Sequence, residues 1–313
     1  TSNALGVDES KIVSYWNEGN LTWKLDADGK LTISGKGAMK DYDADDNRSP
    51  AYNNLKVKKI VIEDGVTSIG ESAFENCSLT SITIPKSVTS IGELVFYGCN
   101  SLTSITIPDG VTSIGNFAFA FCRNLTGITI SDSVTSIGDD AFYNCSSLIS
   151  ITIPKNVTSI GNSVFENCSS LTDITIPDRV TSIGNWAFLN CSSLTSITIP
   201  DSVTSIGNTA FYNCSGLTSI TIPDSVTSIG NTAFKNCSSL KTISLSCKSS
   251  LKRSNFGDQA NLVSYTLHTL KKTEAKAVTC SEDGNKAYWT CEHCGKYFLS
   301  DDTNPETAEA VEL

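Results

Sequence analysis

The sequence predicts a mainly β solenoid, an elongated stack of short coils, and three observations carry this prediction. First, a phrase close to "LTSITIPDSVTSIGNTAFKNCSS", residues 217–239, recurs with a period of 23 along most of the 313 residues. A fixed period of 20 to 50 residues is typical of solenoids and repeat arrays. Second, β-branched residues alternate with polar ones inside each unit, which is strand periodicity. Third, one unit is too small to bury its own apolar residues, so the units must stack.

Each unit is expected to contain two short strands and one loop. In the unit that starts at Leu102, Ile105 and Ile107 flank a threonine, and Val111 and Ile114 follow after a Pro-Asp turn. A stretch such as "NTAFKN" then has room for one helical turn or a tight loop, with Asn or Asp near its start as a cap. Adjacent coils joined by strand pairing lie about 4.8 Å apart, so roughly nine coils predict a rod on the order of 40 Å long.

One phenylalanine and one cysteine per unit are expected to face inward. The phenylalanines are Phe74, Phe96, Phe119, Phe142, Phe165, Phe188, Phe211 and Phe234, and the cysteines are Cys77, Cys99, Cys122, Cys145, Cys168, Cys191, Cys214 and Cys237. The repeats contain no histidine, so a mixed metal-ligand set is unavailable there. We therefore interpret these thiols as reduced, buried and acting as small apolar side chains.

The two ends of the chain depart from the repeat. Residues 5–56 alternate as strands around "DADG", a hairpin turn signal, and predict a small N-terminal β-cap. Residues 57–267 form the solenoid, and residues 268–313 form a Cys-rich module. A solenoid has two open ends with unpaired strand edges, so both terminal segments are expected to cover them.

The repeat resembles one known family closely. The segment "LTSITIPDSVTSIGNTAFYNCSGLTSI", residues 194–220, is similar to the BspA-like leucine-rich repeats of bacterial cell-surface proteins, and the resemblance covers about residues 57–267. The segment "NLTWKLDADGKLTISGKGAMKDY", residues 20–42, resembles the module that commonly precedes these repeats. The resemblance implies a curved leucine-rich-repeat solenoid of 23-residue coils, with roles in adhesion or host-protein binding rather than catalysis.

The C-terminal module contains a candidate zinc site. His268 lies twelve residues before Cys280, Cys291 follows eleven later, and Cys294 completes a Cys-x-x-Cys pair. Three cysteines and one histidine suit tetrahedral Zn²⁺, and Gly295 permits the turn that points amides at a thiolate. The module also resembles short Cys-rich modules at the ends of bacterial surface proteins, so a small zinc-ribbon-like β module with a structural zinc ion is expected.

Other readings of this module remain open. His293 competes as the fourth ligand, and the cysteines could instead form a disulfide, stay free or act as a redox pair. If His268 is a ligand, it lies just past the last repeat strand, so the metal would attach the module to the end of the solenoid.

Charge and composition exclude several classes of function. The net charge of −10 repels nucleic acid and anionic membrane surfaces, and no stretch approaches 18 consecutive apolar residues, so neither nucleic-acid binding nor membrane insertion is expected. Both histidines, His268 and His293, lie in the last module, so the repeats hold no Ser-His-Asp or Cys-His arrangement. A row of aspartates after the turns is interrupted by Lys86 and Lys155, and we expect no enzyme.

If the invariant positions build the scaffold, binding specificity must come from the variable ones. The position before each "AF" or "VF" and the position after the phenylalanine vary most, and their large apolar members are Tyr97, Phe117, Tyr143, Trp186, Leu189 and Tyr212. Exposed aromatics are common anchors at protein interfaces, although each of these could instead pack against a neighbouring coil. We therefore predict an extracellular or cell-surface adhesion module that binds a host or neighbouring-cell protein or glycan. The alternative is a passive spacer with no ligand site of its own.

Overall fold

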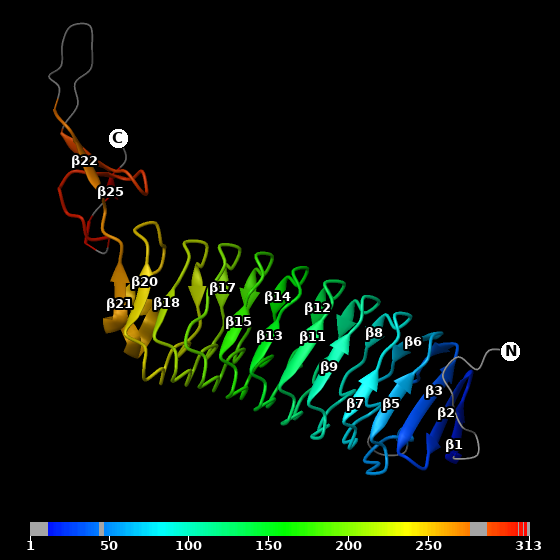
Figure 1. Cartoon of the computed structure of the whole chain (residues 1–313). Coiled ribbons are helices and arrows are strands. Elements are labelled where there is room, and N and C mark those ends of the chain that lie inside the picture. The colour runs from blue at the N-terminus through cyan, green and yellow to red at the C-terminus, as the bar shows by residue number, and fades with distance from the viewer. Residues whose placement is uncertain (1–11, 44–46, 276–286, 306, 309, 312–313) are drawn as a thin grey trace, which may run out of the picture.

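The protein is an elongated, gently curved stack of coils, described here from a computed structural model (Figure 1). The structure describes residues 12–43, 47–275, 287–305, 307–308 and 310–311. A four-stranded cap lies at the N-terminal end of the stack, and a small separate sheet lies beyond its C-terminal end. The solenoid that the sequence predicts is therefore confirmed.

The N-terminal cap extends two faces of the solenoid, the first through β1 (Ile12–Glu18), β2 (Leu21–Asp26) and β3 (Lys30–Gly35) and the second through β4 (Gly37–Ala38). The predicted "DADG" hairpin joins β2 to β3, where the Asp26 carboxylate accepts the N–H groups of Asp28 and Lys30 at 3.0 and 2.8 Å. Strand β3 then pairs in parallel with the first strand of the solenoid, so no break in pairing separates the cap from the coils.

In every coil except the one that begins at Leu194, a first strand contributes to one face of the stack. These strands are β5 (Lys59–Ile62), β7 (Ser81–Thr83), β9 (Ser104–Ile107), β11 (Gly127–Ile130), β13 (Ser150–Thr152), β15 (Asp173–Thr175), β18 (Ser219–Thr221), β20 (Thr242–Leu245) and β21 (Val263–Tyr265). Pairing is parallel and in register, as in Ile105 opposite Ile128. The isoleucines point into the core while the serines and threonines between them are exposed, as the alternation predicts.

The second strand of each coil, the "SI" of the repeat, builds a second face. These strands are β6 (Val66–Ile69), β8 (Ser90–Ile91), β10 (Ser113–Ile114), β12 (Ser136–Ile137), β14 (Ser159–Ile160), β16 (Ser182–Ile183), β17 (Ser205–Ile206) and β19 (Ser228–Ile229). Threonines just before these strands extend the pairing, since the Thr112 N–H donates to the Thr89 carbonyl at 2.8 Å and the Thr112 hydroxyl to the same carbonyl at 3.1 Å.

The third side consists of tight turns, and the helical alternative for "NTAFKN" is wrong. Leu94, Phe96 and Gly98 donate their N–H groups to carbonyls of the next coil at 2.8–3.0 Å. The backbone takes positive φ at Leu94 (57°) and Gly98 (67°), and the equivalent positions repeat this in every coil. A helix would direct these N–H groups along its own axis instead, so bonding between coils prevents it.

The core is a continuous column that runs through all the coils. The phenylalanine rings from Phe96 to Phe234 stack on one another with centroids 5.0–5.6 Å apart. All eight phenylalanines and all eight repeat cysteines are buried. Each thiol after the first donates to the carbonyl of a phenylalanine in an earlier coil, as Cys145 Sγ does to Phe119 at 3.1 Å. The thiol ladder therefore fills space and gives each of these carbonyls a second hydrogen bond, since the Phe119 carbonyl also accepts the Cys122 N–H at 3.1 Å.

Both ends of this column are closed by aromatic residues. Trp23 of β2 packs against Phe74 at 6.0 Å between ring centroids. At the other end the 3₁₀ segment η2 (Arg253–Leu262) places Phe256 against Phe234 at 6.3 Å. The solenoid core is thus sealed by its own flanking segments, and the module that follows is not needed to cover it.

The module after the solenoid is a small antiparallel sheet of β22 (Leu270–Thr273), β23 (Tyr288–Cys291), β24 (Tyr297–Phe298) and β25 (Ala310–Val311). It has a small core of its own, in which the buried residues are Cys247, Cys291 and Phe298. Within the described residues of the chain, no helix is both long and apolar enough to cross a bilayer.

Candidate functional site

Four metal-ligating side chains converge where the last coil meets the C-terminal module. Cys247, His268, Cys291 and Cys294 each offer one donor atom, and these four atoms lie within 4.8 Å of one another. The Sγ atoms of Cys247 and Cys291 are 3.9 Å apart. The Sγ of Cys294 lies 3.6 Å from Nδ1 of His268. This Cys3His cluster is therefore compact enough for one ion to contact all four donors.

Local structure explains how two of the thiols meet. Cys291 is the last residue of β23, and the chain turns back at once so that Gly295 N–H donates to the Cys291 carbonyl at 2.9 Å. Gly295 has φ +71°, a conformation that side chains with a Cβ rarely adopt. The turn directs the N–H groups of His293 and Cys294 at the Cys291 sulfur. This is the knuckle that the Cys-x-x-Cys spacing predicts.

The surroundings of the cluster shift the pKa values of two of its thiols in opposite directions. Burial raises the pKa of Cys291, but hydrogen bonds from the Cys294 N–H, the His268 side chain and the His293 N–H outweigh it and hold this pKa below its usual value. Burial raises the pKa of Cys247, and the adjacent Cys291 sulfur raises it further. The polar groups around the Cys291 sulfur therefore favour its thiolate, whereas the surroundings of Cys247 favour its neutral thiol.

The sequence-based ligand set agrees with this cluster at three positions. His268, Cys291 and Cys294 come together, whereas Cys280 lies outside the described residues. The exposed His293 is not a member of the cluster. Sequence analysis missed Cys247, which follows β20 in the last part of the solenoid. Its position was a usable signal, because it lies ten residues after Cys237 and so breaks the 23-residue period.

A second group of residues forms an aromatic row on the turn side of the solenoid. The ring centroid of Phe121 lies 5.1 Å from that of Tyr97 and 5.2 Å from that of Tyr143. The Arg123 guanidinium lies 5.5 Å from the Phe121 centroid. Sequence analysis selected Tyr97 and Tyr143 but missed Phe121, which occupies a positive-φ position held by asparagine in most other coils, such as Asn144.

The remaining sequence-predicted binding residues lie along the same side. Phe117, Leu189 and Tyr212 are half-buried, and Trp186 is 45% exposed. The Tyr212 hydroxyl accepts a hydrogen bond from Asn236 of the next coil at 2.8 Å. The Tyr212 side chain thus contributes to a contact between coils, whereas much of the Trp186 side chain is accessible to a partner.

Carboxylates beside the aromatic row differ from those on the opposite edge. Asp109 and Asp132, on the turns between the two strands of a coil, pair with lysines at 3.4 and 2.9 Å. Within the described ranges neither Asp140 nor Glu166 has such an ion pair. Burial and the charges of Glu166 and Asp139 raise the pKa of Asp140 to about 6. The region around Tyr143 therefore carries negative charge that the protein itself does not neutralise.

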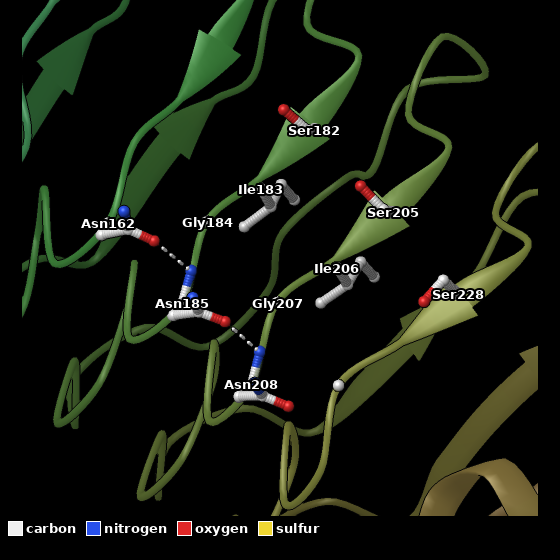
Figure 2. A pocket seen from close by; sticks show the side chains of 11 residues that line it. Asn162, Ser182, Ile183, Gly184, Asn185, Ser205, Ile206, Gly207, Asn208 and Ser228 are labelled. Carbon is white, nitrogen blue, oxygen red and sulfur yellow. Dashed lines mark hydrogen bonds between the residues drawn. The ribbon is translucent and has the colours of Figure 1, made fainter.

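The second face offers less chemistry. A shallow depression over β16, β17 and β19 is lined by the Ser, Ile, Gly and Asn of successive repeats, and none of its lining residues is ionisable at neutral pH (Figure 2). Figure 2 shows the Asn162 side chain accepting the Asn185 N–H and the Asn185 side chain accepting the Asn208 N–H, at 3.0 and 2.7 Å. The side-chain oxygens of Asn162 and Asn185 therefore join neighbouring coils.

The first face departs from the repeat at Gly127 and at Asp173, which both replace the usual serine. Gly127 leaves open space where a side chain would lie. Ile149 in the next coil is 50% exposed beside it, and both line a depression over β9, β11 and β13. Most of this face is the hydroxyl-rich surface that the sequence predicts, so the depression at Gly127 distinguishes three coils from the others.

Comparison with known protein families identifies the type of repeat. The family described as "BspA type Leucine rich repeat region (6 copies)" matches residues 48–172 and 158–281, well over half of the chain. The chain belongs to the BspA-type leucine-rich repeat family. Among curated proteins, none matches this BspA-type chain.

Several solved structures are similar to this BspA-type protein. A leucine-rich repeat protein from Bacteroides ovatus is 30% identical over 80% of this chain and 76% of its own, with a TM-score of 0.53. A leucine-rich repeat protein from T. pallidum is 27% identical over 58% of this chain and 91% of its own, with a TM-score of 0.47. A leucine-rich cell-surface protein from Faecalibacterium prausnitzii is 26% identical over 82% of this chain and 96% of its own, with a TM-score of 0.37.

Proposed function

We propose that the chain is an extracellular or cell-surface adhesion module that binds a host or neighbouring-cell protein or glycan through the turn side of its solenoid. One observation carries the proposal. The otherwise uniform repeats vary on this side, where the row of Tyr97, Phe121 and Tyr143 lies beside carboxylates without cationic partners. These rings, which meet at steep interplanar angles of 59° and 67°, provide an apolar anchor, and the neighbouring charges provide an orienting field. The unpaired Asp140 and Glu166 favour cationic groups on the partner.

Binding to arrays of proteins and glycans tests this proposal. The matched variants are Tyr97→Ala with Tyr143→Ala, which shorten the row, and Trp186→Ala, which removes the most exposed of the candidate binding residues. Thr198→Ala with Thr221→Ala, on the first face, serves as the control. We expect ligands that bind the intact chain and the control but lose at least about tenfold in affinity with one of the aromatic variants. Equal binding by all variants would contradict the assignment of this surface.

The alternative, a passive spacer, is favoured by the near identity of the units. Threonine and asparagine side chains on the second face bond to the neighbouring coil rather than point outward. A spacer predicts no ligand for the intact chain at any useful concentration, so the same arrays separate the two functions.

We further propose that the Cys3His cluster holds one structural zinc ion. In a tetrahedral site with Zn–S of about 2.3 Å and Zn–N of about 2.0 Å, two sulfurs lie about 3.8 Å apart and a sulfur and a nitrogen about 3.5 Å apart. The corresponding separations are 3.9 Å for Cys247 and Cys291 and 3.6 Å for Cys294 and His268. A disulfide would need sulfurs at about 2.05 Å. When bound, the ion would act as a cross-link, because all four donors come from the protein and no position is left for substrate.

Elemental analysis of the purified full chain tests the zinc proposal. We expect about one zinc per chain and loss of that zinc to a strong chelator. Purified protein without zinc that fails to take it up at neutral pH, or that contains a disulfide among these cysteines by mass spectrometry, would contradict it.

A further inference from the structure

The four members of the Cys3His cluster come from two folding units. Cys247 follows β20, whose residues pair in parallel with β18 and β21 of the solenoid. Cys291 and Cys294 belong to the knuckle of the C-terminal module. His268 lies between the two units, and its backbone N–H donates to the Thr303 carbonyl of the module at 2.8 Å. One donor is therefore positioned by the solenoid and two by the module.

Cys247 differs from every cysteine of the ladder in its partner. Cys237, the last repeat cysteine, donates to the Phe211 carbonyl at 3.0 Å and belongs to the solenoid core. The Cys247 side chain instead contacts Cys291 and belongs to the separate small core of the module. Leu245, only two residues earlier, is still part of the solenoid core. The sulfur of Cys247 thus leaves the solenoid to meet the donors of the module.

Packing alone gives the module little to hold it in place. Its core has three buried residues, Cys247, Cys291 and Phe298, and two of them are members of the cluster. Side chains such as Leu270 and Trp289 pack against this core only partly buried. Units this small are seldom stable without a disulfide or a metal. The solenoid, in contrast, is already closed by Phe256, so it does not depend on the module.

We infer that the bound ion is a clamp between the two units, with Cys247 as the ligand that the solenoid supplies. This inference rests on the zinc proposal above. Because the ion can reach all four donors only when the module lies against the last coil, metal binding and docking of the module are one event. The alternative is a site contained within the module, in which Cys280 replaces Cys247. Such a site would leave the module joined to the solenoid by the chain alone.

Competition between the full-length protein and a zinc-binding dye separates these two ligand sets. The variants are Cys247→Ala and Cys280→Ala, with Cys237→Ala as the matched control from the ladder. Loss of a ligand should exceed the roughly 10- to 100-fold loss that follows when a group behind a ligand is removed. We therefore expect Cys247→Ala to weaken zinc binding more than about 100-fold, while the other two variants stay within about threefold of the unmodified chain. A loss below about tenfold in Cys247→Ala, or a larger loss in Cys280→Ala, overturns the clamp.

Hydrogen exchange distinguishes a ligand from a residue that only packs. With zinc present, amides of residues 287–305 should exchange at least about tenfold faster in Cys247→Ala than in the unmodified chain, while residues 57–245 stay protected. After chelation the two proteins should exchange alike in residues 287–305. A difference that persists equally without zinc means that Cys247 acts through packing, and it overturns the inference. If the unmodified chain binds no zinc at all, the zinc proposal itself fails, which is a different result from either of these.

Discussion

Cysteine has opposite roles in the solenoid and in the module that follows it. Cys145 and Cys291 are both buried. The Cys145 thiol donates to a backbone carbonyl and has a pKa raised well above its usual value, first of all by burial. The pKa of Cys291 is lowered instead, because N–H donors of the knuckle and the His268 side chain outweigh its burial. Burial alone does not decide the chemistry of a thiol, since the polar groups that face the sulfur determine which form is stable.

The two regions also differ in what closes them. The solenoid buries one aromatic ring per coil in a single column that ends on Trp23 and Phe256. The module has only a small apolar core, and potential metal ligands make up part of it. The stability of the solenoid should therefore fall when buried apolar volume is lost, and the stability of the module should fall when its metal is lost.

Phe142→Ala should have the largest effect on this contrast. Phe142 stacks between Phe119 and Phe165 at 5.4 and 5.6 Å, so its removal leaves a cavity in the middle of the column. We expect the free energy of unfolding of the solenoid to fall by about 3–5 kcal/mol, measured by denaturant titration, with zinc content unchanged. A loss below about 1 kcal/mol, or loss of zinc in the folded variant, would contradict the separation of the two regions.

Cys145→Ala tests the ladder with a smaller change. The variant removes a buried sulfur and its hydrogen bond to Phe119. The expected cost is about 1–2 kcal/mol in the free energy of unfolding, with no effect on zinc affinity in the dye competition. If Cys145→Ala is as stable as the unmodified chain, the thiols of the ladder are not contributing to the core.

Backbone conformation offers a third comparison. The module uses Gly295 where φ is +71°, whereas the solenoid accepts Thr232 at φ +56°. A β-branched residue is strained there and asparagine is tolerated better. We expect Thr232→Asn to raise the free energy of unfolding by about 0.5–1 kcal/mol. Thr232→Ala, which also loses the hydroxyl contact to Thr209, is the control and should not reproduce this gain. A destabilised Thr232→Asn would mean that the position favours threonine for another reason.

The smallest effect concerns pH. The pKa of Asp140 is about 6 in the folded chain, above the value near 3.9 of an unfolded aspartate. The folded state therefore binds its proton more tightly, so the contribution of Asp140 to stability falls as pH rises from about 4 to 6 and stays unfavourable above that. We expect Asp140→Asn to gain under about 1 kcal/mol more at pH 7.5 than at pH 4, since solvent screens a half-exposed group. Thermal unfolding at the two pH values measures this difference, and a gain that is independent of pH would contradict the raised pKa.

The sequence was most informative where one pattern repeats. The strict spacing of Phe and Cys predicts the inward column, and alternation predicts which strand residues face out. The turn side could not be predicted as readily, because its backbone bonds run between coils and only the stacked structure contains them, as for Leu94 and Asn116. Trp23 and Phe256 were not foreseen as the ends of the column, since neither belongs to the repeat.

In the candidate sites, too, features formed by sequence neighbours could be predicted and features formed by distant residues could not. The Cys-x-x-Cys spacing with Gly295 predicts the knuckle because those residues are neighbours in sequence. Cys247 is 44 residues from Cys291, and only the fold brings them together. Phe121 was missed because sequence analysis compared the positions directly beside the buried phenylalanines. Phe121, the central ring of the row, lies one residue further along its coil than Tyr97 and Tyr143 do in theirs, where a phenylalanine replaces asparagine.

Residue-resolved alkylation of cysteines in the native full chain, with zinc and after chelation, measures this contrast in one experiment. The eight thiols of the ladder should remain unmodified under both conditions. Cys247, Cys291 and Cys294 should react only after the metal is removed. Rapid modification of the ladder in the folded protein, or equal reactivity of the other three thiols with and without zinc, would contradict the division of cysteines into core residues and metal ligands.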